Sequence, residues 1–233
     1  MNKDFSESWC GYYPERRARI HSIDDSKHEL NQTQVTRLLQ KGYRRYAGHY
    51  YKNYCRTCHE CIPYRVLVDE FKPNRAMRRT FQRNADLTLQ WYTPLPTEEK
   101  FQLYLKYQLA RHKSNEEYSR SLRKILLQAM IEQMYTNPID SIELTIYKEE
   151  KVIGFAIFDV LEDSLSAVYS VFDPDYHVRS LGTFNILQSI EKTCALGLPY
   201  LNLGLYLEFH EKMNYKSKFT PAEIYINHAW RRL

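Results

Sequence analysis

Three cysteines stand at regular spacing in the stretch YCRTCHECIP, residues 54–63. Cys55, Cys58 and Cys61 form a C-x2-C-x2-C pattern. Thiolates grouped in this way are typical ligands of zinc or of an iron–sulfur cluster, and both usually take a fourth ligand. Cys10, in WCGYYP, supplies that fourth thiolate. The sequence therefore predicts a structural four-thiolate site for zinc or a cluster, with free, buried or redox-sensing thiols as the alternative.

The composition is that of a folded protein from a reducing compartment. The chain has 233 residues, of which 43% are hydrophobic and 26% are charged. Its first residues contain no apolar signal segment, and no run of 18 apolar residues occurs, which argues against secretion and membrane spanning. Five cysteines, three of them clustered, do not fit a disulfide framework. We therefore expect a cytoplasmic protein with no membrane partner.

Positive charge is concentrated in residues 41–83. This segment holds eleven Lys and Arg against three acidic residues, a net charge of +8, so the remaining residues sum to −3 within the total of +5. Such a local excess of cations predicts a polyanionic or acidic partner. The alternative is a solvated charged face that acids elsewhere in the fold balance.

Hydrophobic periodicity predicts an α+β fold with a mixed sheet. In the first half, the pattern indicates helices over 31–41, from 97, and from 119 to the Asn137-Pro138 stop, and strands over 62–68 and 86–92. In the second half, it indicates strands over 141–160, 165–172, 197–206 and 222–230, with a helix over 182–196. This order matches the acyltransferase fold of acetyl-CoA-dependent N-acetyltransferases.

The proline-containing segment 93–100 predicts a connection between two parts of the chain. We expect a smaller, basic, cysteine-containing N-terminal domain over 1–95 and an acyltransferase-fold domain over 96–233. N-terminal segments are allowed to pack into the second domain.

A phosphate-binding type of loop precedes the predicted helix at 182–196. Arg179, Ser180 and Gly182 occupy the positions of an R-x-x-G motif, whose backbone N–H groups and helix N-terminus can cradle a pyrophosphate. Phe184 stands where a small residue would let the backbone approach phosphate. We expect its ring to obstruct coenzyme A, so the predicted acyl donor is a different one.

Three long stretches resemble one enzyme family. They are CGYYPERRARI, then the run from KGYRRYAGHYYKNYC to KPNRAMRR, then the run from LSAVYSVFDPDYHVRSLGT through LGLPYLNLGLY to KMNYKSKFTPAEI. In content and order they resemble the bacterial aminoacyl-tRNA–protein transferases, and most nearly their aspartate/glutamate leucyltransferase branch. Only the central helical segment, 97–137, is divergent.

The resemblance implies an activity and its partners. Family members move an amino acid from charged tRNA onto the α-amino group of a protein with an acidic first residue, which marks it for N-degron degradation. The expected partners are leucyl-tRNA and proteins beginning with Asp or Glu, and the chemistry requires no cofactor. Three alternatives remain: transfer of arginine, an acetyl-CoA-dependent N-acetyltransferase, and a non-enzymatic RNA-binding module.

Candidate site residues follow from this chemistry. The aminoacyl ester is already activated, so the enzyme need only orient an amine and accept one proton. Tyr169, Lys212 and Tyr215 lie in the resembling stretches, and Asp159 is a candidate proton acceptor near a strand end.

Arginines are the candidates for substrate binding, because a guanidinium binds carboxylate and phosphate with two parallel hydrogen bonds. We expect Arg44 or Arg45 to bind the acidic acceptor side chain. Arg75, Arg78, Arg79 and Arg179 are expected to meet tRNA phosphates, with Ser180 in the same loop as Arg179.

Overall fold

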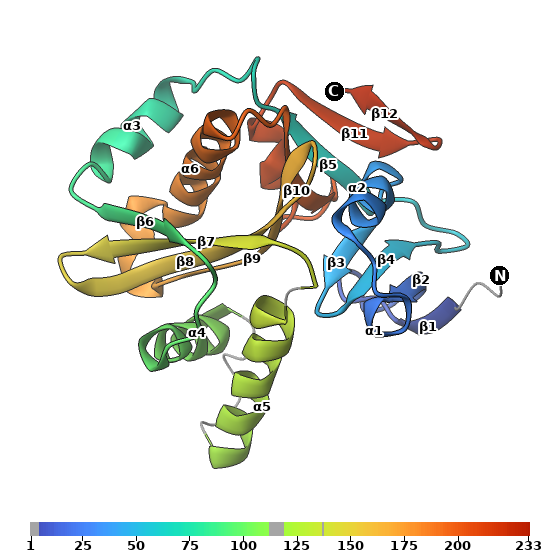
Figure 1. Cartoon of the computed structure of the whole chain (residues 1–233), viewed down its shortest axis with the longest axis horizontal. Coiled ribbons are helices and arrows are strands. Elements are labelled where there is room, and N and C mark those ends of the chain that lie inside the picture. The colour runs from blue at the N-terminus through green and yellow to red at the C-terminus, as the bar shows by residue number, and fades with distance from the viewer. Residues whose placement is uncertain (1–4, 112–118, 137) are drawn as a thin grey trace.

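The computed structural model describes residues 5–111, 119–136 and 138–233. The N-terminal part forms a small antiparallel sheet in the strand order β1-β2-β4-β3. Its strands are β1 (Phe5–Trp9), β2 (Arg17–Asp24), β3 (Arg44–Tyr46) and β4 (His49–Asn53). Figure 1 shows this sheet beside the large one, with the short α1 (Asp25–His28) and α2 (Gln32–Gln40) next to it. The sequence had predicted no strand in this region.

Helix α2 confirms the helix expected over 31–41. Asn31 caps it through a reciprocal capping box with Gln34, which satisfies two otherwise unpaired backbone N–H groups. Its apolar side buries Val35 and Leu39 in a small core that includes Tyr50 and Leu161. Because Leu161 follows the strand β8 (Lys151–Val160), this core joins the small sheet to the large one.

The large sheet has eight strands in the order β12-β11-β5-β10-β9-β8-β7-β6. Its other strands are β5 (Ile62–Leu67), β6 (Thr88–Tyr92), β7 (Ser141–Lys148), β9 (Ser164–Phe172), β10 (Tyr200–Tyr206), β11 (Ala222–Ile226) and β12 (Ala229–Arg232). Strands β9 and β10 pair in parallel, and the other neighbours pair antiparallel. The mixed sheet and the α+β class are therefore confirmed.

Helices cover both faces of the large sheet (Figure 1). Helices α3 (Arg75–Arg83) and α6 (Leu181–Ala195) pack on one face, and α4 (Glu98–Arg111) and α5 (Arg120–Met130) pack on the other. Strand β8 shows why: Ala156 and Phe158 enter the core under α6, while Phe155 and Ile157 enter the core under α4 and α5. Successive side chains of a strand point to opposite faces, so a continuous apolar strand is buried on both sides.

One expected strand needs correction, and the helix expected from residue 119 is confirmed. The single strand expected over 222–230 is the hairpin β11–β12, because Asn227 and His228 take left-handed φ angles of 50° and 62° and turn the chain. Helix α5 continues into a π-helical turn over Ile131–Tyr135. The predicted stop residue Asn137 lies outside the described residues.

The expected domain boundary at residue 95 runs through the large sheet. Strands β5 and β6 precede it, yet β5 pairs with β10 and β11, and β6 pairs with β7. These are N-terminal segments of the kind allowed to pack into the second domain. The part of the N-terminal region outside the large sheet is thus the β1–β4 sheet with α1, α2 and the cysteine loop. Among the described residues, no helix combines the length and apolar character needed to cross a membrane.

Candidate functional site

Strands β9 and β10 stop pairing partway along their length, and we call the unpaired stretch between them the opening. Their parallel pairing joins Tyr200–Asn202 to Ser164–Ser166. Beyond it, β9 continues to pair with β8, and β10 continues to pair with β5. Within the described residues, the facing backbone edges of 167–172 and 203–206 therefore have no strand between them. Such an edge offers free N–H and C=O groups to a bound substrate.

Tyr169 lies on the β9 side of this opening. Its hydroxyl accepts a hydrogen bond of 2.8 Å from the Gln108 side-chain amide, and its ring packs on Tyr104. Burial raises the pKa of Tyr169, with neighbouring tyrosines adding to the effect. The hydroxyl is thus protonated at neutral pH and can donate a hydrogen bond to a substrate oxygen.

Arg44 lies on the β10 side, against the backbone of Gly204. A Cβ built at position 204 would stand 2.7 Å from Arg44 Nε, closer than atoms can approach, and Gly204 has a φ of 75°. Glycine is the residue that accepts both constraints. The strand register shifts here, between Asn202 and Gly204. This irregularity turns the backbone so that the guanidinium of β3 can lie on β10.

Tyr215 belongs to the same side as Arg44. It lies in the 3₁₀ helix Asn214–Lys218, next to the buried Lys216, and 39% of its surface is exposed. Burial of its hydroxyl raises the pKa of Tyr215, Arg44 lowers it, and Tyr107 raises it further. These three side chains are therefore close enough to affect one another. The structure brings the predicted residues Arg44 and Tyr215 together, opposite Tyr169.

Lys216 is a residue of this site that the sequence analysis missed. Its side chain is 3% exposed, whereas the predicted Lys212 is exposed. The Lys216 ammonium contacts Met213 Sδ at 3.9 Å and lies 4.8 Å from the Tyr215 ring centre. Burial and the nearby Arg44 lower the pKa of Lys216 to about 7. Both lysines belong to KMNYK, and nothing in that stretch separates the buried one from the solvated one.

Arg45 and Asp159 form a buried ion pair. Arg45 Nε and Nη2 donate to the two carboxylate oxygens of Asp159 at 2.7 and 2.9 Å, and each side chain is 1% exposed. Ser141 Oγ donates to the same carboxylate, and Arg45 Nη1 donates to the Ala47 and Thr136 carbonyls. A carboxylate held in this way cannot meet a solvent-borne amine. This is a correction: the pair joins β3 to β8, and we leave both residues out of the proposed site.

Arg179 and Ser180 stand before α6, as expected. Ser180 is the N-cap residue with a left-handed φ of 55°. The Arg179 guanidinium donates to both carboxylate oxygens of Asp86 at 2.7 and 3.0 Å, which lowers the pKa of Asp86. Any phosphate that approached Arg179 would compete with this exposed carboxylate.

Phe184 does not obstruct the loop before α6. Its side chain is 3% exposed, lies in the core under α6 and packs edge-on against Phe81. Position 184 is one turn into the helix, and the helical rotation turns its side chain towards the sheet. The expected steric argument against coenzyme A is therefore wrong, because the ring never reaches the phosphate-binding position.

Helix α3 presents a basic surface next to α6. Arg75, Arg78 and Arg79 are exposed along it, and Arg83 near its end donates to the Val178 carbonyl at 2.7 Å. Asn84, just after α3, donates to the Arg179 carbonyl. The three predicted phosphate contacts thus share one exposed helix, which is attached to the loop before α6.

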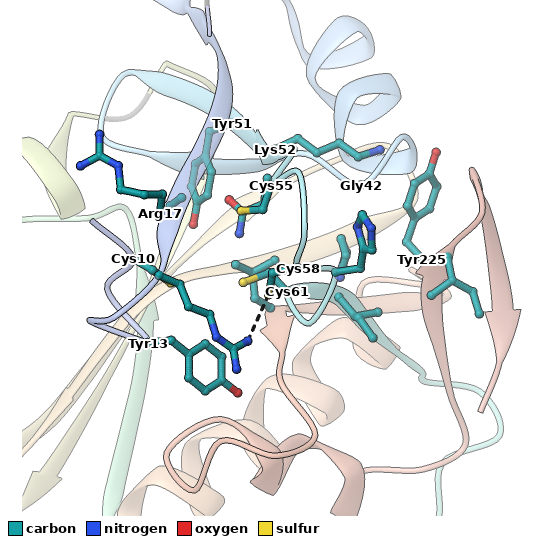
Figure 2. Close-up of a pocket in the computed structure, with 18 of the residues that line it drawn as sticks. Cys10, Tyr13, Arg17, Gly42, Tyr51, Lys52, Cys55, Cys58, Cys61 and Tyr225 are labelled. Atoms are coloured by element: carbon teal, nitrogen blue, oxygen red, sulfur yellow. Dashed lines mark hydrogen bonds between the residues drawn. The ribbon is translucent and has the colours of Figure 1, made fainter. Parts of the chain in front are cut away.

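The four cysteines of the predicted metal site line one cavity of about 380 Å³. Figure 2 shows Cys10, Cys55, Cys58 and Cys61 around it, together with Arg17, Tyr51 and Lys52. Among the described residues, however, no three His, Cys, Asp or Glu side chains form a group that could hold a metal ion. The shared cavity matches the prediction, and the spacing of the thiols within it does not fit a metal.

Glu60 joins the N-terminal turn to the cysteine loop. Arg16 pairs with Glu60 at 2.8 Å and also donates to Cys58 Sγ at 3.5 Å, the contact drawn in Figure 2. The Tyr13 hydroxyl donates to the same carboxylate. The N-terminal turn and the cysteine loop are therefore connected by an ion pair and hydrogen bonds.

Comparison with known proteins places the chain in a family. The description "Arginine-tRNA-protein transferase, N terminus" matches residues 8–79, and "Arginine-tRNA-protein transferase, C terminus" matches residues 99–226. The chain belongs to this family. The resemblance stated from the sequence is thereby confirmed, and the protein is an aminoacyltransferase.

Two relatives match this transferase over nearly all of its length. The aspartate/glutamate leucyltransferase of Leptospira interrogans is 38% identical over 220 residues, 94% of this chain and 84% of the relative. That of Marinobacter nauticus is 35% identical over 224 residues, 96% of this chain and 92% of the relative. Among solved structures, L-PGS from Bacillus licheniformis is 15% identical over 74% of this chain and 58% of that chain, with a TM-score of 0.47.

Proposed function

We propose that this transferase moves leucine from leucyl-tRNA onto the α-amino group of proteins whose first residue is Asp or Glu, and so marks them for N-degron degradation. Relatives 35–38% identical over at least 94% of the chain carry the name aspartate/glutamate leucyltransferase. The observation that carries the proposal is the opening between β9 and β10, with Tyr169 on one side and Arg44 and Tyr215 on the other.

The chemistry needs orientation more than activation. The acceptor amine attacks the ester carbonyl, the tetrahedral intermediate collapses, and the ribose hydroxyl leaves while the amine loses one proton. A protonated tyrosine hydroxyl at the opening can stabilise the developing oxyanion, and the raised pKa of Tyr169 keeps it a donor. Free backbone N–H groups of the β9 edge suit the same task.

The two substrates have separate cationic surfaces. Arg44, at the opening, is placed to bind the acidic acceptor side chain, since its neighbour Arg45 is already bound to Asp159. The exposed cations of α3 suit the phosphates of tRNA, which remain hydrated when bound. Exposed Lys212 can reach the acceptor end in the same way.

The proposal is tested by a transfer assay with purified protein. We expect labelled leucine to pass from leucyl-tRNA to peptides that begin with Asp or Glu, and not to a matched peptide that begins with Asn. Arginyl-tRNA is the competing donor, because the matched family descriptions name arginine. Transfer of arginine with none of leucine would reassign the donor, and transfer of neither would refute the proposal.

The four cysteines carry a separate proposal, namely that they hold zinc or an iron–sulfur cluster. The cavity that the four cysteines share supports this proposal, although the described residues contain no group arranged to hold a metal ion. No step of the proposed reaction relies on a metal. We expect about one equivalent of zinc or a cluster in purified protein, and Cys58→Ser should lose the metal and melt at a lower temperature. Metal-free wild-type protein with the same melting temperature as Cys58→Ser would rule the site out.

A further inference from the structure

Two cations lie together beside the opening, and the described residues give neither of them an ion-pair partner. The Lys216 side chain is 3% exposed, and Arg44 Nε is shielded from solvent and has no hydrogen-bond partner among the described residues. Burial is the main cause that lowers the pKa of Lys216, and the charge of the nearby Arg44 is the second. They come from different elements, β3 and the 3₁₀ helix 214–218, and the Arg44 guanidinium lies against Gly204 of β10.

The groups around these cations are tyrosines. Tyr12 and Tyr51 act on Arg44 from the N-terminal turn and from β4, and Tyr215 acts on it from the 3₁₀ helix. Tyr107 of α4 acts on Tyr215. In the described part of the chain, no Asp or Glu is among the groups that act on Arg44 or Lys216. The wall therefore offers phenolic hydroxyls and positive charge.

A buried lysine beside a guanidinium whose Nε is shielded is unfavourable in the empty protein. Burial of a charge is costly unless an opposite charge or a set of hydrogen bonds offsets it. Among the described residues, the other buried cations are paired: Arg45 binds Asp159, Lys100 binds Glu143, and Arg65 binds Glu223. The Arg44–Lys216 pair departs from that pattern, and an anionic ligand would restore it.

The burial of Lys216 and of Arg44 Nε favours a carboxylate over a phosphate of tRNA. A phosphodiester is attached to bulky nucleotides on both sides, so it reaches exposed cations more readily than enclosed ones. The side chain of a first residue stands at a chain end and can enter alone. A planar guanidinium also matches a carboxylate in two-point contact.

We propose that Lys216 and Arg44 together form the pocket that binds the carboxylate of the acceptor's first side chain, and that Lys216 takes up a proton when the carboxylate enters. This rests on the proposed function and names its specificity-determining lysine. Lys216 is a binding residue in this scheme, and Tyr169 and the β9 edge remain on the donor side.

The proton uptake has a defined pH dependence. With a pKa of about 7, Lys216 of the empty protein is mostly neutral at pH 8 and mostly charged at pH 6. A bound carboxylate favours the charged form. Acceptor binding at pH 8 should therefore take up about one proton, binding at pH 6 should take up almost none, and affinity should fall up to tenfold per pH unit above 7.

The first test compares specificity in three proteins. Lys216→Met removes the charge from the pocket, and Lys218→Met is the control because Lys218 is exposed on the same 3₁₀ helix. With leucyl-tRNA saturating, we expect Lys216→Met to raise KM for an Asp-first peptide at least tenfold and Lys218→Met to keep the wild-type KM. An unchanged KM for that peptide in folded Lys216→Met would overturn the pocket.

The second test measures protons directly and needs no transfer. Titration calorimetry of an Asp-first peptide in two buffers of different ionisation enthalpy gives the number of protons taken up. We expect about one at pH 8 for wild type and Lys218→Met, and a value lower by about one for Lys216→Met. Equal uptake in all three proteins would refute the proton switch, even if the transfer assay succeeds.

The same variants distinguish the proposal from its alternatives. If Lys216→Met weakens binding of leucyl-tRNA and leaves peptide binding unchanged, the pocket binds RNA phosphate and the proposal is wrong. If wild type transfers nothing but binds the Asp-first peptide with proton uptake, the proposed function fails and the pocket stands. Melting temperatures of the variants show that each is folded.

Discussion

Arg45→Met should lower the free energy of unfolding by about 3–5 kcal/mol, because it leaves a buried carboxylate without its partner. Asp159 is 1% exposed, and five hydrogen bonds of 3.0 Å or less hold it and Arg45. Since Arg45 also donates to the Ala47 and Thr136 carbonyls, its loss breaks those hydrogen bonds as well. Urea unfolding monitored by circular dichroism measures the change.

A matched surface pair provides the control. Arg56 and Glu7 lie 3.3 Å apart with side chains 76% and 45% exposed, so Arg56→Met should cost less than 1 kcal/mol. The double variant Arg45→Met with Asp159→Leu should recover much of the loss, because no charge then stays buried. A loss below 1 kcal/mol for Arg45→Met would contradict a structural role and return Asp159 to the list of candidate bases.

Lys216→Met should have the opposite effect and stabilise the protein, most strongly at pH 7 and below. The folded pKa of Lys216 is about 7, and that of a lysine in the unfolded chain is 10.5. The unfolded state therefore binds the proton more tightly, and the lysine destabilises the fold at every pH below 10.5. Methionine has a similar length and removes that penalty.

The sign of the pH dependence follows from the two pKa values. Below pH 7, Lys216 is charged in both the folded and the unfolded state, and its destabilising effect has its full value. Between pH 7 and 10.5, this effect falls by about 1.4 kcal/mol per pH unit. The gain from Lys216→Met should therefore be about 2 kcal/mol larger at pH 7 than at pH 9. Thermal unfolding of both proteins across this range measures it, with Lys218→Met as the control.

A gain that stays constant from pH 6 to 9 would contradict the lowered pKa of Lys216. A destabilised Lys216→Met at pH 7 would show that the lysine is already paired with an anion in the free protein. If Lys216→Met is more stable and also binds the acceptor poorly, the wild-type lysine lowers stability in exchange for function, as is common at binding sites.

Much of the fold follows from local sequence signals. The capping residue Asn31 and the apolar spacing of Val35 and Leu39 determine α2, and the continuous apolar run of β8 predicts a strand buried on both faces. The polar interval in SIELTIYKEEKVIGFAIFDV predicts the β7–β8 hairpin. The small sheet escaped prediction because its strands are polar and lack a clear apolar alternation, and pairing between distant segments stabilises them.

The candidate site also combines features that the sequence determines with features that it leaves open. The sequence alone determined the family resemblance, the basic segment, the α+β order and the set of residues from which the site is drawn. It could not choose between Arg44 and Arg45, because adjacent residues of a strand face opposite sides and only the sheets around β3 decide which side meets Asp159.

The sequence also could not decide which of two nearby lysines is buried, or towards which side the Phe184 ring points. Lys212 and Lys216 belong to one short motif, yet packing against β10 and Arg44 buries one and leaves the other in water. Phe184 turns into the core through the rotation of α6, although its position in the motif pointed to the phosphate loop. Residue types follow from the sequence, whereas burial, partner and charge state depend on contacts between segments far apart in the chain, and only the tertiary structure determines those.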